Sequence, residues 1–530
     1  MRISLAFCLL GFVIVPVVLS NQQPFEPTNF DVRGALLQNG VDISALQSLA
    51  DVGKHNVTRR CKATCSTLQT LFGLSKLSLH PTMSYWSNQQ REIIPHCAFT
   101  PDKAVEVSTL VLLSRLTQCP FAVKSGGHAA FAGASNIGGG VLVDLSGLKQ
   151  RILASDHKTV AIGPGNRWLE VYEYLTPYNL AVVGGRAATV GVGGLTLGGG
   201  ISHHTNEYGL ACDNVASYEL VTASGSVILV NQDHYPDLYW ALRGGGNNFG
   251  IVTAFHYETL PQGLMFASRR RYNASYLPAL VDAFVHATEG AVEDTKLAHF
   301  FSATYYSGAR IVSSEVEYFT PVDTNQPPEI MKEYLAITPL THDTQNTSLA
   351  NTTYGLSEVM PDGFRTTMWS QSFKLSTQLL NRMIDHFYKV APDIPSIAPS
   401  ISFQAFSKPA LAAMQKKGGN ALGLDPSKGP FFHVNFYTTW TDPKDDKAIM
   451  LAAQSFISTC NQISKELGAY NEYMYMPYSS PYQAVIPAYG AANLERLKAV
   501  SKRYDPQSIF QRLQPGYFKF DSAPFGLIVT

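Results

Sequence analysis

Six glycines fall within eleven residues at positions 190–200, the segment VGVGGLTLGGG. Glycine loses more backbone entropy on folding than any other residue, so this density indicates a chain that must take positive φ or approach another group closely. Glycine turns also present backbone N–H groups in concave arrangements that bind anions such as a pyrophosphate. The G-x-G-x-x-G spacing of a Rossmann loop is missing. The segment therefore predicts either a ligand cradle of another class or a turn-rich loop without a ligand.

Composition indicates a globular protein with a small-molecule partner. The 530 residues suffice for two or three domains, with 45% apolar and 15% charged residues. Forty Lys and Arg residues balance forty Asp and Glu residues, so no net charge attracts nucleic acid or an anionic membrane.

The first half of the chain has an α+β pattern. Residues 94–262 alternate short apolar runs with glycine-rich turns. Thr100-Pro101 predicts a helix with proline at its first position, and a second helix begins within 165–171. The apolar side of the first helix is formed by Val105, Val107, Leu110, Leu113 and Leu116. Strands are predicted at 121–124, 141–145 and 159–162, and as a hairpin at 218–222 and 226–230.

The second half has a different pattern. Over 263–475 glycine becomes less frequent and aromatic and β-branched residues become more frequent, with long helical segments at 378–390 and 446–467. This predicts an antiparallel sheet covered by helices. A last amphipathic helix at 494–504 is stopped by Asp505-Pro506.

The N-terminus predicts a secretory protein. Residues 1–20 contain Arg2, an apolar run and small residues before a polar segment, which is typical of a signal peptide cleaved near Ser20. The run is too short to span a bilayer and Pro16 interrupts it. Four N-x-[ST] sequons agree with a secreted glycoprotein; they lie at Asn56, Asn273, Asn346 and Asn351.

The cysteines are interpreted in the same way. Cleavage removes Cys8 and leaves six, of which the four between 61 and 119 are plausible disulfide partners in any of three pairings. Cys61-x3-Cys65 has no matching His or Cys pair at ligand spacing, so we expect no metal.

The stretch KSGGH at 124–128 places His128 after two glycines, where it could be a turn residue, a metal ligand or a general base. Together with the glycine segment, 209–215 (GLACDNV) and 240–253 (WALRGGGNNFGIVT), in this order, it resembles the FAD-binding domain of the vanillyl-alcohol oxidase (PCMH-type) superfamily. The C-terminal motifs within 489–510 are similar to the closing motif of the berberine bridge enzyme-like branch.

That resemblance implies a fold class and a division of the chain. The fold is α+β, with a two-lobed PCMH-type FAD-binding domain and a substrate domain whose antiparallel sheet is backed by helices. We divide the chain into a signal peptide (1–20), an N-terminal region (21–93), the FAD-binding domain (94–262), the substrate-binding domain (263–475) and a C-terminal segment that returns to the FAD domain (476–530).

The resemblance also implies covalent FAD. In that family the matching histidine is bonded through its ring to the 8α carbon of the flavin, so His128 is the expected anchor. Lys124 replaces the usual arginine and keeps its charge without the planar fork. Many relatives have a second bond from a cysteine, whose position in our alignment is Gly191, so we expect a single attachment and interpret Cys212 as a buried thiol. The expected cofactor-binding residues are His128, Lys124, Ser125, Gly126, Gly127, Gly133, Gly193, Gly194, Leu195, Gly198, Gly199, Gly200, Asp213, Ile251 and Val252.

The expected substrate side is formed by the second half of the chain. Asn435 takes the place where the family presents a Glu or Gln above the flavin, and a carboxamide can orient a substrate but cannot take its proton. Tyr475-Met476-Pro477-Tyr478 resembles a Y-x-N-Y motif with proline for asparagine. Tyr478 is a candidate base that needs help from a positive charge or hydrogen bond, or else both tyrosines are pocket walls. His203 and His204 are interpreted as either pocket residues or solvated side chains, and we favour the former.

The resemblance implies an FAD-linked oxidase, and with the predicted signal peptide we expect a secreted protein, which we also expect to be a monomer. It would pass a hydride from a small, largely apolar alcohol, amine or polycyclic secondary metabolite to flavin N5, with O2 giving H2O2 and with cyclisation as an added outcome. Two alternatives remain open: a carbohydrate oxidase, and a flavin-bearing binding protein without a redox role.

Overall fold

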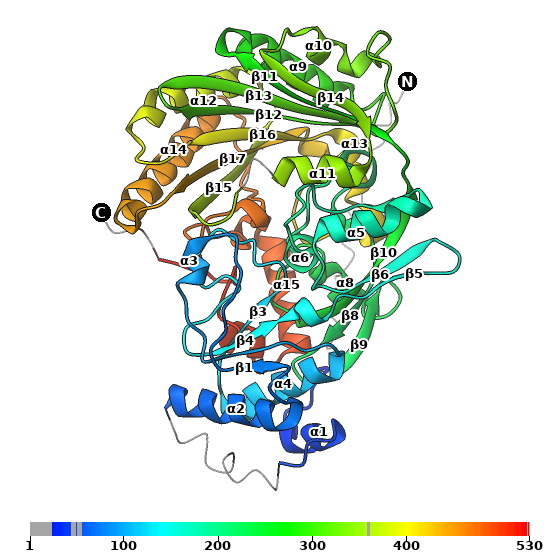
Figure 1. Ribbon diagram of the computed structural model, residues 1–530, viewed down its shortest axis with the longest axis vertical. Helices are drawn as coiled ribbons and strands as arrows, with labels where there is room; N and C mark the ends of the chain where they lie inside the picture. The colour runs from blue at the N-terminus through cyan, green and yellow to red at the C-terminus, as the bar shows by residue number, and fades with distance from the viewer. Residues whose placement is uncertain (1–23, 44–48, 50–55, 358–360, 527, 529–530) are drawn as a thin grey trace, which may run out of the picture.

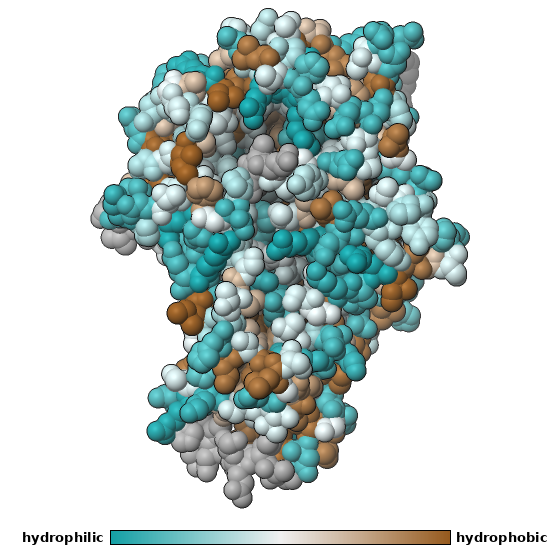
Figure 2. Space-filling model, in the orientation of Figure 1, coloured by the Kyte–Doolittle hydropathy of each residue, from teal (hydrophilic) through white to brown (hydrophobic). Residues whose placement is uncertain are grey.

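Three sheets organise the chain (Figure 1), which the computed structural model describes over residues 24–43, 49, 56–357, 361–526 and 528. The predicted signal peptide, with Cys8, lies outside the described residues. No helix within the described part is long and apolar enough to cross a membrane. On the face that Figure 2 shows, hydrophilic residues predominate and hydrophobic ones are scattered.

The small sheet has the order β1-β2-β4-β3. Its parallel strands are β2 (Cys97–Phe99), β4 (Val141–Asp144) and β3 (Phe121–Lys124), and β1 (Leu77–Ser78) is antiparallel to β2. Helices α1 (Val32–Gln38), α2 (Val57–Phe72) and α4 (Ala104–Thr117) flank it in Figure 1. Both predicted strands, 121–124 and 141–145, are confirmed to within one residue, because continuous apolar runs suit parallel strands covered on both faces.

The predicted start of the first helix at Pro101 is wrong by three residues. Helix α4 begins at Ala104, because the Thr100 N–H donates to Lys76 O at 2.8 Å and keeps the preceding chain beside β1. Glu106 then accepts from the Asp102 N–H at 3.0 Å, ahead of the helix. Val105, predicted on the apolar side, is 43% exposed as a result.

The middle sheet follows along the chain, in the order β5-β6-β10-β8-β9, with β7 also paired to β10. The predicted strand at 159–162 is β6, and the predicted hairpin at 218–230 is formed by β8 and β9. The helix predicted to begin within 165–171 is α5 (Trp168–Leu175). The strands are β5 (Arg151–Leu153), β6 (Thr159–Ile162), β7 (Leu180–Val182), β8 (Val215–Val221), β9 (Val227–Asn231) and β10 (Ile251–Pro261).

The large sheet is antiparallel throughout, in the order β14-β11-β13-β12-β16-β17-β15. Helices α9 (Leu277–Gly290), α12 (Thr377–Val390) and α14 (Asp446–Glu466) cover one face (Figure 1). The predicted helices at 378–390 and 446–467 are therefore confirmed to within one residue. The strands are β11 (Met265–Asn273), β12 (Leu297–Tyr306), β13 (Ala309–Tyr318), β14 (Thr341–Thr347), β15 (Arg365–Lys374), β16 (Ser400–Phe406) and β17 (Phe431–Trp440).

The two faces of the large sheet differ in chemistry. Side chains alternate along a strand, so Phe432, Val434 and Phe436 of β17 join the helix-covered core. His433 and Asn435 therefore point to the opposite face, which approaches the glycine segments. That polar face supplies one wall of the site.

The C-terminal segment returns to the small and middle sheets. Helix α15 (Ala491–Tyr504) ends at Asp505, whose carboxylate accepts from the N–H groups of Ile509 and Phe510 at 2.8 Å. The Asn247 and Asn248 side chains then donate to Gly516 O and Phe518 O, each at 3.1 Å. These bonds hold the last described residues against the loop that follows α8 (Pro236–Leu242).

Two disulfides select one of the three possible pairings. They join Cys61 to Cys119 and Cys65 to Cys97, and so link α2 to the connection between α4 and β3 and to strand β2. Cys212 is free and buried, as predicted. The four sequon asparagines are exposed, although the Asn346 side chain bonds to both backbone groups of Val322.

Candidate functional site

A cavity opens between the glycine segments and the polar face of the large sheet. Residues 125–128, 186–195 and 246–252 line one side, and side chains from the large-sheet region and the C-terminal segment close it. The predicted site residues that line it are Ser125, Gly126, Gly127, His128, Gly193, Gly194, Leu195, Ile251, Val252 and Tyr478.

Two glycine backbones touch at the floor of the cavity. A Cβ atom on Gly191 would lie 2.2 Å from the Gly126 nitrogen, and one on Gly126 would lie 2.4 Å from the Gly191 nitrogen. Ser125 stabilises the contact between Gly126 and Gly191, since its hydroxyl donates to Pro164 O at 2.6 Å and accepts from the Gly193 N–H at 3.1 Å. The glycines at these positions are therefore required by close packing of two chain segments.

His128 projects from this floor and contacts Thr189 and Trp86. Its Nε2 atom lies 3.1 Å from the Thr189 hydroxyl oxygen, and the Trp86 ring stacks on it at 4.3 Å between centroids and 13° between planes. Burial, with a contribution from Arg167, lowers the pKa of His128 to about 3. The ring is therefore a neutral imidazole with a free electron pair at ordinary pH.

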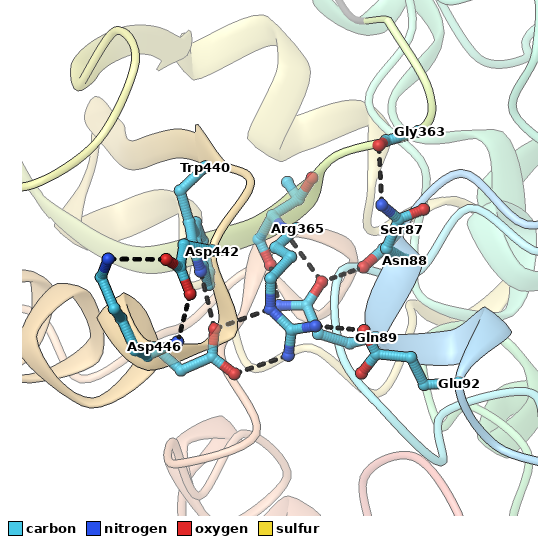
Figure 3. A network of polar contacts seen from close by, with 11 residues as sticks. Ser87, Asn88, Gln89, Glu92, Gly363, Arg365, Trp440, Asp442 and Asp446 are labelled. Carbon is cyan, nitrogen blue, oxygen red and sulfur yellow. Dashed lines mark hydrogen bonds and ion pairs between the residues drawn. The ribbon is translucent and has the colours of Figure 1, made fainter.

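A polar network fixes the segment that carries Trp86 (Figure 3). The buried Arg365 at the start of β15 donates to Asp446 Oδ1 at 2.7 Å and to Asp446 Oδ2 at 2.5 Å, and also pairs with Glu92. Asn88 donates to Gly363 O at 2.7 Å, and the Trp440 indole donates to Asp446 at 2.6 Å. The network ties the chain next to Trp86 to the edge of the large sheet, and so holds the indole over His128.

Several predicted cofactor residues do not line the cavity but support it from behind. The Lys124 ammonium lies 3.4 Å from Asp144 and packs under Gly127. Positive φ at Gly199 and Gly200 turns the chain so that Ile201 reaches the cavity, while Gly198 packs on Pro477. The other two are Gly133, whose carbonyl meets Gly516, and Asp213.

Asp213 has a structural environment of its own. Its carboxylate accepts from the Leu210 N–H and from the Asn420 amide, each at 2.9 Å. Burial raises its pKa to about 6. The carboxylate therefore braces the turn after α7 (Thr205–Tyr208), the helix that follows α6 (Val192–Leu197), and does not line the cavity.

Tyr478 is the candidate base that reaches the cavity, and Arg186 lies beside it. The Arg186 Nη2 atom donates to the Tyr478 hydroxyl at 3.1 Å. Burial lowers the pKa of Arg186, but the Tyr478 phenol and Glu317 outweigh it and raise it overall, so the guanidinium stays charged. The structure thus supplies the positive charge that a phenol needs to act as a base.

The other predicted substrate residues lie behind this pair. Tyr475 accepts from the Ile201 N–H at 2.7 Å and packs edge-on against Tyr478, and burial raises its pKa well above the ordinary value. Asn435 is buried on the polar face, outside the cavity lining. Tyr475 therefore positions the Ile201 backbone, whereas the buried Asn435 Oδ1 atom has no hydrogen-bond partner among the described residues.

His203 and His204, predicted as pocket residues, lie outside the cavity lining. His203 is buried 3.8 Å from Glu317, and His204 bonds to Gln262 at 2.8 Å and stacks on Phe319. Burial lowers their pKa values to about 3 and about 4. They fill the junction between the middle and large sheets.

The residues present fit FAD. The lining alternates glycine backbone with apolar side chains such as Val190, Leu195 and Phe255, which suits a flat ring system and its polar tail. No cysteine of the described residues lines the cavity. A side chain at position 191, where our alignment places the second anchor of relatives, would collide with Gly126. Ala187, in the same loop, lines the cavity.

Sequence reasoning missed Trp86, Arg186 and Thr189. An arginine in the apolar run AVVGGRAATVG was a usable signal, because a charge there must face a cavity or a partner. Trp86 and Thr189 carry no such signal, since only the folded chain brings them to His128.

Comparisons with known proteins indicate the family and the fold. A family profile described as FAD binding domain matches residues 95–231. The chain is 35% identical to FAD-dependent monooxygenase FUP4 of Fusarium proliferatum, over 82% of this chain and 87% of that protein. Berberine bridge enzyme from Eschscholzia californica has a similar structure, with a TM-score of 0.69 at 16% identity, covering 88% of this chain and 100% of that one. Xylooligosaccharide oxidase from Myceliophthora thermophila has a TM-score of 0.66 at 20% identity, covering 84% and 95%.

Proposed function

The chain belongs to the FAD-linked oxidoreductases of the vanillyl-alcohol oxidase (PCMH-type) family, which includes the berberine bridge enzyme-like proteins. We propose that it oxidises a small, largely apolar alcohol, amine or polycyclic metabolite. One observation carries the proposal: His128 and the Arg186–Tyr478 pair line the same cavity. An anchor for the cofactor thus shares a space with a candidate base.

His128 is the proposed covalent anchor of the cofactor. Its ring is neutral, so its free electron pair is available for a bond to the flavin 8α carbon. The Thr189 hydroxyl and the Trp86 indole fix the ring position. Gly191 and Ala187 offer no thiol, which favours a single attachment.

Tyr478 is the proposed base. FAD held in the cavity would accept a hydride at N5 and return two electrons to O2 as H2O2. The Tyr478 oxygen would take the proton of the substrate hydroxyl or amine, with the Arg186 Nη2 atom 3.1 Å from that oxygen. The apolar walls around it exclude water from the reacting C–H bond.

A secretory location is part of the proposal. The sequence of residues 1–20, two disulfides and four exposed sequons support it, since disulfides persist in oxidising compartments. Mass analysis of protein from culture medium, before and after removal of N-glycans, tests the location and the mature N-terminus.

The experiment for the activity is a substrate screen under nitrogen. Candidate aromatic alcohols, amines and polycyclic phenols are added to the holoprotein while flavin absorbance is followed, and air is then admitted. The proposal predicts bleaching, recovery in air and one H2O2 per product. Bleaching without recovery in air would contradict the oxidase assignment, and the absence of any flavin would contradict the whole proposal.

Two other redox outcomes have specific support. The name of the Fusarium relative favours monooxygenation, which isotopically labelled O2 would reveal as label in the product. The Myceliophthora structure favours an oligosaccharide oxidase, which rapid bleaching by oligosaccharides would reveal. A binding protein without a redox role would retain oxidised flavin with every substrate.

A further inference from the structure

Arg186 is the charged side chain of the cavity. Among the described residues that line it, no other is ionised at neutral pH, since His128 is neutral. Arg186 belongs to the loop between β7 and α6 but reaches across to the large sheet. Its guanidinium carbon lies 5.1 Å from the Phe300 ring centroid on β12, and its Nη2 atom donates to Gln404 Oε1 on β16 at 2.6 Å.

Most of its hydrogen-bonding capacity is unused. A guanidinium carries five N–H donors. Gln404 and Tyr478 take the two on Nη2, and no described residue accepts from Nε or Nη1. A cation with unused donors facing an apolar cavity has a large desolvation cost unless a ligand supplies acceptors.

Two carboxylates, Glu315 and Glu317, lie near Arg186 but do not line the cavity. Glu317 lies 3.8 Å from His203 and Glu315 lies 3.8 Å from Arg269, and neither forms an ion pair with Arg186. Burial raises the pKa of both glutamates, and the charges of Arg186 and Arg269 oppose that shift. His433, which packs against Tyr478 on this face, is kept neutral because burial lowers its pKa to about 3. Arg186 is therefore the charged group that reaches the cavity, while neither glutamate lines it.

We propose that Arg186 determines specificity by binding an anionic oxygen of the substrate, a carboxylate or an ionised enol or phenol, on an otherwise apolar body. Nε and one Nη1 hydrogen form the two-donor fork that matches such a group. Met368, Leu356 and Pro477 supply apolar surface for the rest of the molecule. This inference rests on the proposed function, because it names the class of substrate that Tyr478 would deprotonate.

The flavin itself offers a competing partner for the unused donors. The known contacts of the guanidinium argue against it: Gln404 and Phe300 belong to the large sheet, and Tyr478 follows it in the chain. The side chain thus leans away from the glycine segments that form the cofactor floor. The reduction potential of the flavin distinguishes the two partners.

The test uses matched ligands on the purified holoprotein. 2-Naphthoate and its methyl ester are titrated while flavin absorbance and Tm are followed; 2-naphthol, above and below its own pKa, separates phenolate from carboxylate recognition. The variants are Arg186→Met, which removes the charge, and Arg186→Lys, which keeps it without the fork. Arg382→Met, an exposed arginine on α12, is the control.

We expect wild type to bind naphthoate at least about tenfold more tightly than the ester, the value of one charge-assisted hydrogen bond. Arg186→Met loses that preference, Arg186→Lys keeps part of it, and Arg382→Met keeps all of it. The inference is overturned if wild type binds the ester as tightly as either anion, if neither anion saturates, or if the preference survives in Arg186→Met. It is also overturned if Arg186→Met changes only the flavin potential. Protein without flavin would contradict the proposed function instead, while the Tm titration would still report the preference.

Discussion

The Nε2 atom of His128 lies 3.1 Å from the hydroxyl oxygen of Thr189, and this bond joins the two glycine-bearing segments of the cavity. Thr189 stands two residues before Gly191, whose backbone touches Gly126. The backbone that carries the imidazole is thus held by the contact of Gly126 with Gly191, and the ring is held by Thr189. The Nε2 atom therefore already has a hydrogen-bond partner.

Thr189→Val keeps the shape of this residue but removes the hydroxyl. Because one hydrogen bond contributes about 1 kcal/mol, we expect covalent attachment of flavin to slow about fivefold. The fraction of flavin that stays with acid-precipitated protein measures it. Thr189→Ser should restore attachment, and an unchanged fraction in Thr189→Val would show that the bond has no role.

Tyr478→Phe should slow flavin reduction by about a hundredfold or more, because it removes the proposed base while leaving the ring in place. Tyr475→Phe is the matched comparison, since its hydroxyl bonds to the Ile201 backbone inside the protein. That variant should lower Tm and keep most of the rate. Both variants are measured by stopped-flow absorbance and by thermal unfolding. The assignment is contradicted if Tyr475→Phe slows flavin reduction while Tyr478→Phe only lowers Tm.

Gly191→Ala places a methyl group 2.2 Å from the Gly126 nitrogen, a separation that forces the two segments apart. We expect a loss of about 1–3 kcal/mol in the free energy of unfolding and weaker retention of flavin. Gly263→Ala is the control, because a Cβ there meets nothing within 4 Å. Equal stability of the two variants in urea unfolding would argue against the close contact.

Arg365→Met tests the network that holds the segment next to Trp86. Loss of its bonds to Asp446 and Glu92 should lower the free energy of unfolding by about 1–3 kcal/mol, because Arg365 is buried. Arg382→Met breaks an exposed pair with Glu466 and should cost less than about 1 kcal/mol. The loss should also slow flavin attachment in Arg365→Met, because the indole over His128 is no longer fixed.

The sequence predicted those features that depend on neighbouring residues. Apolar runs placed β3 and β4, the turn at Ala223-Ser224-Gly225 placed the β8–β9 hairpin, and the helical period placed α12 and α14. The family resemblance predicted that His128, Gly126 and Gly127 bind the cofactor, and these residues line the cavity. Each of these signals is local in the chain.

Features that depend on distant residues could not be predicted in the same way. Lys124 and Asp213 lie within the matching motifs, yet Asp144 and Asn420 draw them behind the cavity. Arg186 acts through Gln404 and Tyr478, more than two hundred residues away in the chain. The disulfide pairing likewise follows from how α2 packs against the small sheet.

Peptide mapping of the denatured, protease-digested protein tests the central claim most directly. The account predicts that flavin stays covalently bound, that it is carried by the peptide containing His128 alone, and that His128→Ala releases it in acid. Flavin that dissociates from the wild-type protein on denaturation, or that is bonded to any other residue, would contradict it.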